Sequence, residues 1–451
     1  MKGKREFMKN LMMTFAFAPL MLVAAPLTLV SPQNGATVPT LSDGQKAYLT
    51  MPRKERVAYF ANHAKRQEMK ALGYYPQPIT LAWKDGTAGA NYKVVVKRLP
   101  DGKVFFTSEG TNTSVKVDNL EIARTYEWSV TGGGELTAKF STEDMAPRLI
   151  RVPNVPNVRD LGGRIGLNGR RVKQGRVIRT AGLNDNASTE YYTRDELEKL
   201  GKITPAMLKK EQQIKDHMAR YRGYQADPKK FNRAHKGWLA FAKGKPSATV
   251  ADYFKYRLDG DQKALDKVFH VKKGQKPGKN RISEVNRDYM LKELGIKSDI
   301  DLRSDGECYG MTGSPLGPTV TWFHYSSSAY GGMQSQWGKE AFTKVFTVFL
   351  DEKTYPLDVH CSAGQDRTGA VAFILNGLLG VKEEDLYLDW ETTGFWNGHS
   401  SFNHARLFNK LVEGFKEKVP GATLHEKIEN YVLALGFTKA DIEKFRSLML
   451  E

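Results

Sequence analysis

The sequence contains very little cysteine. Among its 451 residues only Cys308 and Cys361 are cysteines, which excludes a framework of several disulfides and leaves stability to hydrophobic cores. The chain also lacks a Walker phosphate loop, a dinucleotide-binding glycine motif and the paired ligand spacing of a zinc site. We therefore expect neither a cofactor nor a metal ion.

Long apolar runs are also scarce, because only one segment, from Leu11 to about Val30, approaches the length of a membrane span. Four basic residues precede it within the first nine positions, an order typical of a secretory signal. Pro19 and Pro26 interrupt the run and disfavour a spanning helix. The sequence predicts a signal peptide over residues 1–26 and an exported chain, periplasmic or extracellular, without a membrane span once the signal is removed. An uncleaved N-terminal anchor is the alternative.

The composition, with 40% hydrophobic residues, allows two or three domains with real cores. Residues 27–144 contain short alternating runs typical of β-strands, and Leu27 to Thr40 reads as one edge strand. A helix-like basic segment, 42–72, interrupts them. Leu120 stands six residues before Tyr126, a spacing similar to the tyrosine corner of fibronectin-III and immunoglobulin-like sandwiches. We predict an all-β sandwich with a helical insertion.

The most informative stretch is the run from His360 to Gly369, HCSAGQDRTG. It lies between an apparent strand, 357–360, and an apparent helix, 368–379, and five residues separate Cys361 from Arg367. Such a loop points backbone N–H groups inward at a helix N-terminus, where a phosphate dianion binds.

The residue types in this run suit the binding and transfer of a phosphoryl group. An anion at the positive end of a helix, beside a guanidinium, is stabilised, which makes Cys361 the candidate nucleophile. Arg367 can grip two phosphate oxygens at once. Thr368 is placed to stabilise the departing thiolate, and His360 to orient the loop. The expected phosphate-binding residues are Ser362, Ala363, Gly364, Gln365, Asp366 and Arg367.

This run resembles the signature loop of cysteine-dependent tyrosine phosphatases, in the form found in a bacterial branch with secreted tyrosine and lipid phosphatases. Asn157 to Gly163, NVRDLGG, and Ile300 to Ser304, IDLRS, are similar to two further motifs of that branch. The resemblance implies an α/β catalytic domain over residues 146–451, with a central sheet flanked by helices. It implies supporting roles for Arg159 and Asp160, and a reaction through a phosphocysteine without a metal ion.

The chain departs from this family in two places. Gln365 stands where relatives often have lysine, which argues against substrates carrying several phosphates. The stretch 322–332, where many relatives place a general acid on a mobile loop, contains no carboxylate. Asp366 is then the first candidate for the acid, with a loop-stabilising acceptor as its alternative role. Asp160 and Asp389 are weaker candidates.

The leading function is an exported protein-tyrosine phosphatase, with possible dual specificity, that acts on phosphotyrosine peptides and proteins or other phosphomonoesters. Two alternatives stay open: a phosphoinositide or inositol-phosphate phosphatase, and a surface binding module with a degenerate phosphatase domain. Nucleic acid is the least favoured partner, and the sequence leaves the oligomeric state unknown.

A basic insertion is expected over about 201–287. It holds 22 Lys and Arg against 8 Asp and Glu, a net charge of +14 within a chain whose formal charge is +18. Three roles remain open for it: a solvated helical subdomain, a lid or platform that steers anionic substrate, and a nucleic-acid or anionic-envelope surface. A reversible bond between Cys308 and Cys361 is a further possibility, against a free, half-buried Cys308.

Overall fold

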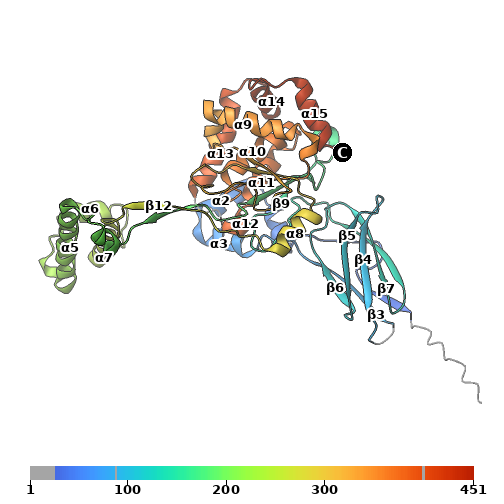
Figure 1. Ribbon diagram of the computed structural model, residues 1–451, viewed down its shortest axis with the longest axis horizontal. Coiled ribbons are helices and arrows are strands. Elements are labelled where there is room, and N and C mark those ends of the chain that lie inside the picture. Colours follow the sequence, from blue (N-terminus) through green and yellow to red (C-terminus); the bar gives the residue numbers. More distant parts are fainter. Residues whose placement is uncertain (1–25, 87–88, 399–401) are drawn as a thin grey trace, which may run out of the picture.

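The computed structural model describes residues 26–86, 89–398 and 402–451 (Figure 1). The signal peptide expected over 1–26 therefore lies almost wholly outside the described residues. Within the described part, no helix combines the length and the apolar character needed to cross a membrane. The chain forms a β unit, a mixed α/β body and a projecting helical arm (Figure 1).

The β unit consists of two sheets that share one core. Alternate side chains of β4 and β7 are buried, and Trp83, Trp128 and Phe140 lie between the sheets. The first sheet has the order β1 (Leu27–Ser31), β3 (Ile79–Asp85), β6 (Ser114–Val117). The second has the order β2 (Ala36–Val38), β8 (Leu136–Thr142), β7 (Thr125–Thr131), β4 (Tyr92–Arg98), β5 (Val104–Gly110).

Two details of this unit bear on the sequence predictions. The segment from Leu27 to Thr40 is not one edge strand, because β1 pairs with β3 in one sheet whereas β2 pairs with β8 in the other. The turn between them carries the chain across the sandwich. The hydroxyl of Tyr126 accepts a hydrogen bond from the backbone N–H of Glu121 at 2.9 Å, as a tyrosine corner requires. Membership of the fibronectin-III class stays a prediction.

Three helices leave the β unit between β2 and β3 and pack on the α/β body. Phe60 belongs to the main core of the body, and Tyr48 packs against Phe395 with ring centroids 5.5 Å apart. The buried guanidinium of Arg56 pairs with Glu391 at 2.6 Å and with Glu384 at 2.5 Å. The helices are α1 (Asp43–Thr50), α2 (Arg53–Ala61) and α3 (His63–Ala71).

The body is built on a five-stranded sheet in which β14, β13, β15 and β10 are parallel and β9 is antiparallel to β10. Because parallel strands end at the same edge, Ala181 lies beside Cys361 and Asp301 beside His360. The strands are β9 (Arg159–Asp160), β10 (Val177–Ala181), β13 (Ser298–Asp301), β14 (Thr321–His324) and β15 (Leu357–Cys361).

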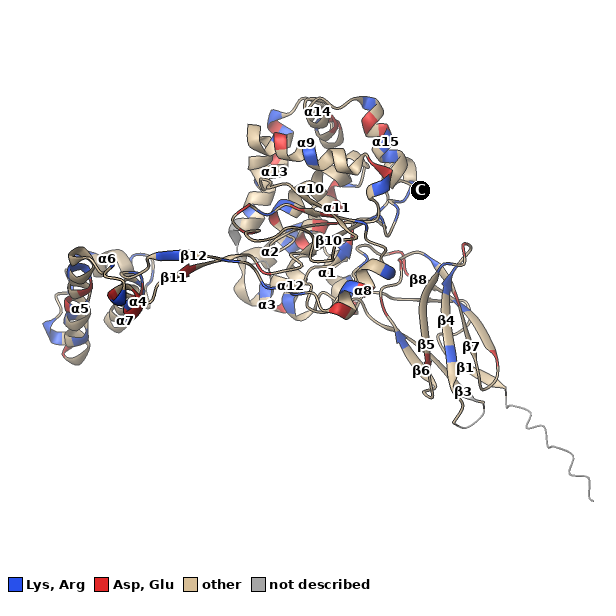
Figure 2. Ribbon diagram, viewed as in Figure 1, with Lys and Arg blue, Asp and Glu red and all other residues tan. Residues whose placement is uncertain are grey.

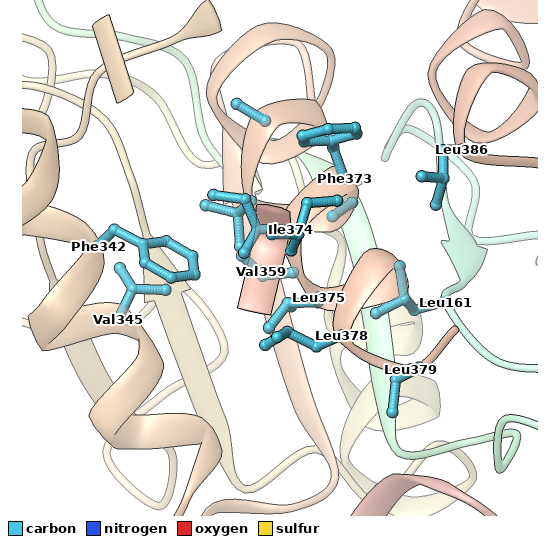
Figure 3. Close-up of a cluster of buried hydrophobic side chains, with 14 of the residues drawn as sticks. Leu161, Phe342, Val345, Val359, Phe373, Ile374, Leu375, Leu378, Leu379 and Leu386 are labelled. Carbon is cyan, nitrogen blue, oxygen red and sulfur yellow. The ribbon is translucent and has the colours of Figure 1, made fainter. Parts of the chain in front are cut away.

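Helices cover both faces of this sheet. On one face Val359 packs against Ile374 of the central helix and lies in the same core cluster as Phe342 (Figure 3). The opposite face packs against α8 (Glu284–Lys292) and the segment 150–158. The first face carries α9 (Gln336–Phe349), α10 (Asp366–Leu378), α11 (Glu383–Glu391), α13 (Phe402–Lys418), α14 (Leu424–Leu433) and α15 (Lys439–Met449), with the short α12 (Gly394–Asn397) after α11.

The arm projects from the body on a two-stranded stalk (Figure 1). Its antiparallel strands are β11 (Ser188–Tyr191) and β12 (Lys272–Lys276). Its head has an aromatic core of its own, centred on Tyr221, Tyr253 and Phe254, and Lys and Arg positions lie along its helices (Figure 2). The head consists of α4 (Arg194–Lys199), α5 (Pro205–Ala226), α6 (Lys236–Ala242) and α7 (Val250–Asp266). The arm overlaps the expected insertion of 201–287, but α8, in the last part of that range, belongs to the body.

Candidate active site

The loop between β15 and α10 gathers the expected phosphate-binding residues. Cys361 is the last residue of β15, and α10 begins at Asp366, two residues earlier than the sequence suggested. Gly364 has φ +61°, and a Cβ there would lie 2.2 Å from the carbonyl oxygen of Thr180. Only glycine therefore allows the loop to approach β10 this closely. The tight turn places the loop amides at the positive end of α10.

The Cys361 thiol is set up to ionise. Burial acts to raise its pKa, but the charge of Arg367 and hydrogen bonds from the hydroxyl and the amide of Thr368 outweigh burial, so the pKa lies below the ordinary value of 9.0. The Thr368 hydroxyl is buried without a hydrogen-bond partner among the described residues, so it is available to the sulfur. The thiolate is the nucleophilic form of cysteine.

Arg367 is held by Glu307, a residue that the sequence analysis missed. Its two terminal nitrogens lie 2.6 and 3.0 Å from the carboxylate oxygens of Glu307, and Nη2 donates to Ser362 Oγ at 3.0 Å. Ser362 Oγ donates to Glu307 at 2.5 Å. Burial acts to raise the pKa of Glu307, but hydrogen bonds from Arg367 and Ser362 lower it well below its usual range. Nη1 also donates to the Leu302 carbonyl oxygen at 3.4 Å, so both terminal nitrogens of Arg367 are engaged within the protein. The pairing orients the guanidinium, and a bound phosphate has to displace part of it.

A buried ionic network supports the loop from below. Asn157 Nδ2 donates to the carbonyl oxygens of Ala363 at 2.9 Å and Gly364 at 3.1 Å. Arg179 Nη2 donates to the carbonyl of Gly364 at 2.6 Å, and its other terminal nitrogen pairs with Asp389. These bonds hold the loop carbonyl groups on the outer side of the loop. The loop N–H groups then point inward, toward the anion site.

Arg159 and Asp160, expected as supporting residues, have different positions. Arg159 is buried, donates to the backbone carbonyl of Asp389 at 2.6 Å and pairs with Asn157, so it acts on the loop through these two residues. Burial and the neighbouring Arg179 lower its pKa to about 9. Asp160 turns away from the loop and accepts hydrogen bonds from Arg148 at 2.9 Å and from two backbone amides. The structure places neither Asp160 nor Asp389 where it could reach a leaving group, because both are buried in ion pairs.

Asp366, the first candidate for the general acid, lies at the rim of the loop. Its carboxylate accepts a hydrogen bond from the Tyr330 hydroxyl, and Nδ1 of His404 lies 3.7 Å away. Burial and the charge of Asp366 raise the pKa of Tyr330 well above its usual range, so this hydroxyl keeps its proton and donates. The Asp366 side chain is 29% exposed, unlike Asp160 and Asp389.

The remaining candidates point elsewhere. Gln365 is buried, and its Oε1 accepts from Asn397 at 2.9 Å, so its side chain is engaged away from solvent. His360 is completely buried between Asp299 and Asp301 on the opposite face of the sheet, and one ring nitrogen lies 3.4 Å from the Cys361 carbonyl oxygen. Burial lowers the pKa of His360, but these carboxylates raise it to about 10.

Both cysteines are free and buried. The Cys308 sulfur lies 3.3 Å from Asp301 Oδ2, and burial and this carboxylate raise the pKa of Cys308 to about 12. A thiol held protonated in this way attacks other sulfurs slowly. The bond between Cys308 and Cys361 stays a prediction.

Comparison with known proteins agrees with this arrangement. A family model described as the tyrosine phosphatase family matches residues 150–271 and 279–451, and the chain belongs to this family. No curated protein matches the chain. The matched part contains the α/β body and most of the arm, and it begins after the β unit.

Proposed function

We propose that this protein is an exported, cysteine-dependent protein-tyrosine phosphatase. The family match supports phosphatase activity in general. The observation that carries the proposal is the Cys361 sulfur in contact with the Arg367 guanidinium at the N-terminus of α10, with the pKa of its thiol lowered. An ionised sulfur in a ring of N–H donors is suited to attack a phosphate ester.

The reaction has two steps. In the first, Cys361 Sγ forms a bond to phosphorus while the bond from phosphorus to the leaving oxygen breaks, and Asp366 donates a proton to that oxygen. In the second, water attacks the phosphocysteine, Asp366 takes the proton back, and the thiolate leaves with a hydrogen bond from Thr368. Arg367 and the loop amides stabilise the charge on the equatorial oxygens throughout.

Phosphotyrosine in peptides or proteins is the leading substrate class. An aromatic ester is long enough to bring its phosphate to Cys361, which is only 1% exposed. A neutral, buried Gln365 adds no positive charge for a second phosphate, which argues against phosphoinositides and inositol phosphates. The basic arm is the one observation that favours this second class, because its charge would attract a multiply charged ligand.

The position of the arm favours a role in docking the substrate over a role as a lid. Its head stands away from the body on the stalk (Figure 1), whereas its root touches the site, since Asn186 Nδ2 donates to Ser362 Oγ and to Glu307 Oε1, both at 3.0 Å. A basic platform in this place attracts an acidic phosphoprotein and raises its local concentration.

A substrate panel tests the proposal. Wild type and Cys361→Ser are compared on an aryl phosphate, on phosphotyrosine and phosphoserine peptides, and on inositol phosphates, with and without vanadate. The proposal requires vanadate-sensitive turnover by wild type alone, with the highest kcat/KM on phosphotyrosine. A higher kcat/KM on inositol phosphates would replace it by the second class, and equal activity of the two proteins would refute it. Wild-type protein that binds phosphopeptides without turnover would identify a binding module.

A further inference from the structure

The face of the sheet opposite the Cys361 side chain carries a polar cluster that the proposed reaction does not use. Asp299 of β13 and Asp358 of β15 are direct partners in the parallel register, and His360 follows two residues later. Because strand side chains alternate, all three lie on the same face. All three are completely buried. Two carboxylates opposite each other in an interior repel unless positive charge lies between them.

Each carboxylate is held by one of its two oxygens. Ser314 Oγ donates to Asp299 Oδ2 at 2.6 Å, and Thr180 Oγ1 donates to Asp358 Oδ2 at 2.9 Å. These hydroxyls come from two different segments on either side of the pair. They leave the Oδ1 atom of each carboxylate buried and without a hydrogen-bond partner among the described residues.

The imidazole is oriented in the same manner. His360 Nδ1 lies 3.4 Å from the backbone carbonyl oxygen of Cys361 and 3.8 Å from Asp301 Oδ1. In metal sites the second ring nitrogen of a ligating histidine is bound in this way, to a carbonyl or a carboxylate, which fixes the tautomer and the ring plane. Nε2 is then the ligating atom, and a metal ion binds there in exchange for the proton that the neighbouring carboxylates hold on the ring.

Three polar groups then come together, because Asp299, Asp358 and His360 each offer one ligand atom and these atoms lie within 4.8 Å of one another. The atoms of interest are Asp299 Oδ1, Asp358 Oδ1 and His360 Nε2. None of these three atoms has a hydrogen-bond partner among the described residues. Nε2 approaches Asp299 Oδ1 to 3.1 Å, an ion-pair distance that lacks hydrogen-bond geometry. Buried polar atoms without partners are rare, and three of them in one cluster indicate a cation-binding position.

We propose that Asp299, Asp358 and His360 bind a divalent transition metal ion through these atoms. One imidazole nitrogen and two carboxylate oxygens suit Zn²⁺, and also Mn²⁺ or Fe²⁺. Zn²⁺ bonds of about 2.0–2.2 Å put tetrahedral ligand atoms roughly 3.3 Å apart. The separation of 3.1 Å between His360 and Asp299 already fits this spacing.

A surface hollow lies next to a residue that contacts the cluster. A hollow of about 520 Å³ is lined by the segment that includes Ser314, Val320 and Trp322. The Ser314 hydroxyl contacts the Asp299 carboxylate, so the Ser314 side chain separates this hollow from the buried cluster.

The ion has a positioning role. It ties β13 to β15 one residue before the nucleophile and lies behind the sheet, away from the phosphate, so no step of phosphoryl transfer passes through it. A ligand that binds the folded chain alone stabilises it by mass action. Binding therefore raises Tm and holds the end of β15, from which the phosphate loop starts. This inference rests on the fold and is independent of the proposed substrate.

The test uses the full-length Cys361→Ser protein, because a thiolate also binds Zn²⁺. The protein is loaded with Zn²⁺, freed of excess metal by gel filtration, and assayed for bound zinc and for Tm. We expect one Zn²⁺ per chain and a raised Tm. Asp299→Asn and Asp358→Asn, each in the same background, should weaken binding on the order of 100-fold and abolish the Tm shift. Co²⁺ in place of Zn²⁺ should give d–d absorption without a sulfur charge-transfer band.

Asp305→Asn is the matched control, because the Asp305 side chain is 94% exposed and lies outside the cluster. It should bind Zn²⁺ as the background protein does. If Asp358→Asn fails to fold, zinc binding by Asp299→Asn and the Co²⁺ spectrum of the background protein decide whether the cluster binds the metal ion. Failure of the background protein to retain Zn²⁺, Mn²⁺ or Fe²⁺ would overturn the proposal and leave an ion pair only. Undiminished binding by Asp299→Asn would also overturn it, since the metal would then lie elsewhere.

Discussion

Glu307 grips both terminal nitrogens of Arg367, at 2.6 and 3.0 Å, and so sets the direction in which this guanidinium meets a phosphate. Glu307→Gln keeps the shape but weakens the pairing. Because small misplacement of a positioning group costs on the order of 10²-fold, we expect kcat to fall by roughly that factor with a smaller change in KM. Steady-state kinetics on an aryl phosphate measure both constants. Unchanged kcat would show that the loop orients Arg367 alone.

The assignment of Asp366 as general acid predicts a dependence on the leaving group. Asp366→Asn should lower kcat by about 10²–10⁴-fold on phenyl phosphate and much less on 4-nitrophenyl phosphate, whose phenolate leaves without a proton. Tyr330→Phe removes the hydrogen bond to Asp366 and should reproduce the pattern with a smaller loss. Equal losses on both esters would give Asp366 only a loop-stabilising role.

The lowered pKa of Cys361 predicts its reactivity with pH. Alkylation by iodoacetamide should have a midpoint below the ordinary thiol value of 9.0, and Thr368→Val should raise that midpoint because a hydrogen bond to the thiolate is lost. Since the pKa is lowered in the folded state, ionised Cys361 contributes stability above the unfolded-state pKa and loses it as the pH falls through the folded-state pKa. Cys361→Ser reports any reaction of Cys308, which should be negligible. A midpoint at 9.0 or above would count against an activated thiol.

The arm can be removed at its stalk. Tyr191 and Lys272 are paired, so replacing residues 193–270 by an Asn-Gly turn closes the hairpin without disturbing its root. We expect unchanged kcat on a small aryl phosphate, a higher KM on an acidic phosphoprotein and a shallower salt dependence of kcat/KM. If kcat/KM and its salt slope on the phosphoprotein stay as in wild type, steering by the arm is rejected and the head is a solvated subdomain.

The ion pair between Arg56 and Glu391 predicts a large effect on stability. Arg56→Met leaves the carboxylate of Glu391 buried and unpaired, which costs about 3–5 kcal/mol in the free energy of unfolding. The double variant Arg56→Met with Glu391→Leu should recover most of this loss, because both charges are gone. Lys54→Met, an exposed neighbour, should change stability by no more than about 0.5 kcal/mol. Urea unfolding measures all three, and a small effect of Arg56→Met alone would mean that water reaches Glu391.

The phosphate loop was accessible to sequence reasoning because one continuous run, 360–369, contains the strand end, the loop and the helix start. Glu307 and Asn186 were missed because they reach the loop through tertiary contacts. A local signal for Glu307 did exist: with Ser304 it forms a Ser-x-x-Glu pair after the DLRS strand, and Ser304 N and Oγ both donate to its carboxylate, at 2.8 and 2.9 Å.

Other differences have physical causes. The break between β1 and β2 depends on which sheet each strand joins, and alternation of apolar residues does not encode that choice. The end of the arm was predicted wrongly because the basic composition continues through 201–287. That α8 packs on the body depends on single buried residues such as Met290, which composition does not reveal. The cluster of Asp299 with Asp358 and His360 depends on the register of two strands far apart in the chain.

Phe60 belongs to the chain before β3, yet its ring completes the interior around Trp390, with centroids 6.1 Å apart. A fragment that starts at residue 146 would therefore lack both Phe60 and Arg56. Its core would have a cavity at the position of the Phe60 ring, and Glu391 would be buried without its ion-pair partner. Trimming the front of the molecule would loosen α11, whose Asp389 anchors Arg179 and through it the phosphate loop. The helices that precede β3 are thus part of the folded catalytic body, although they lie before it in the sequence.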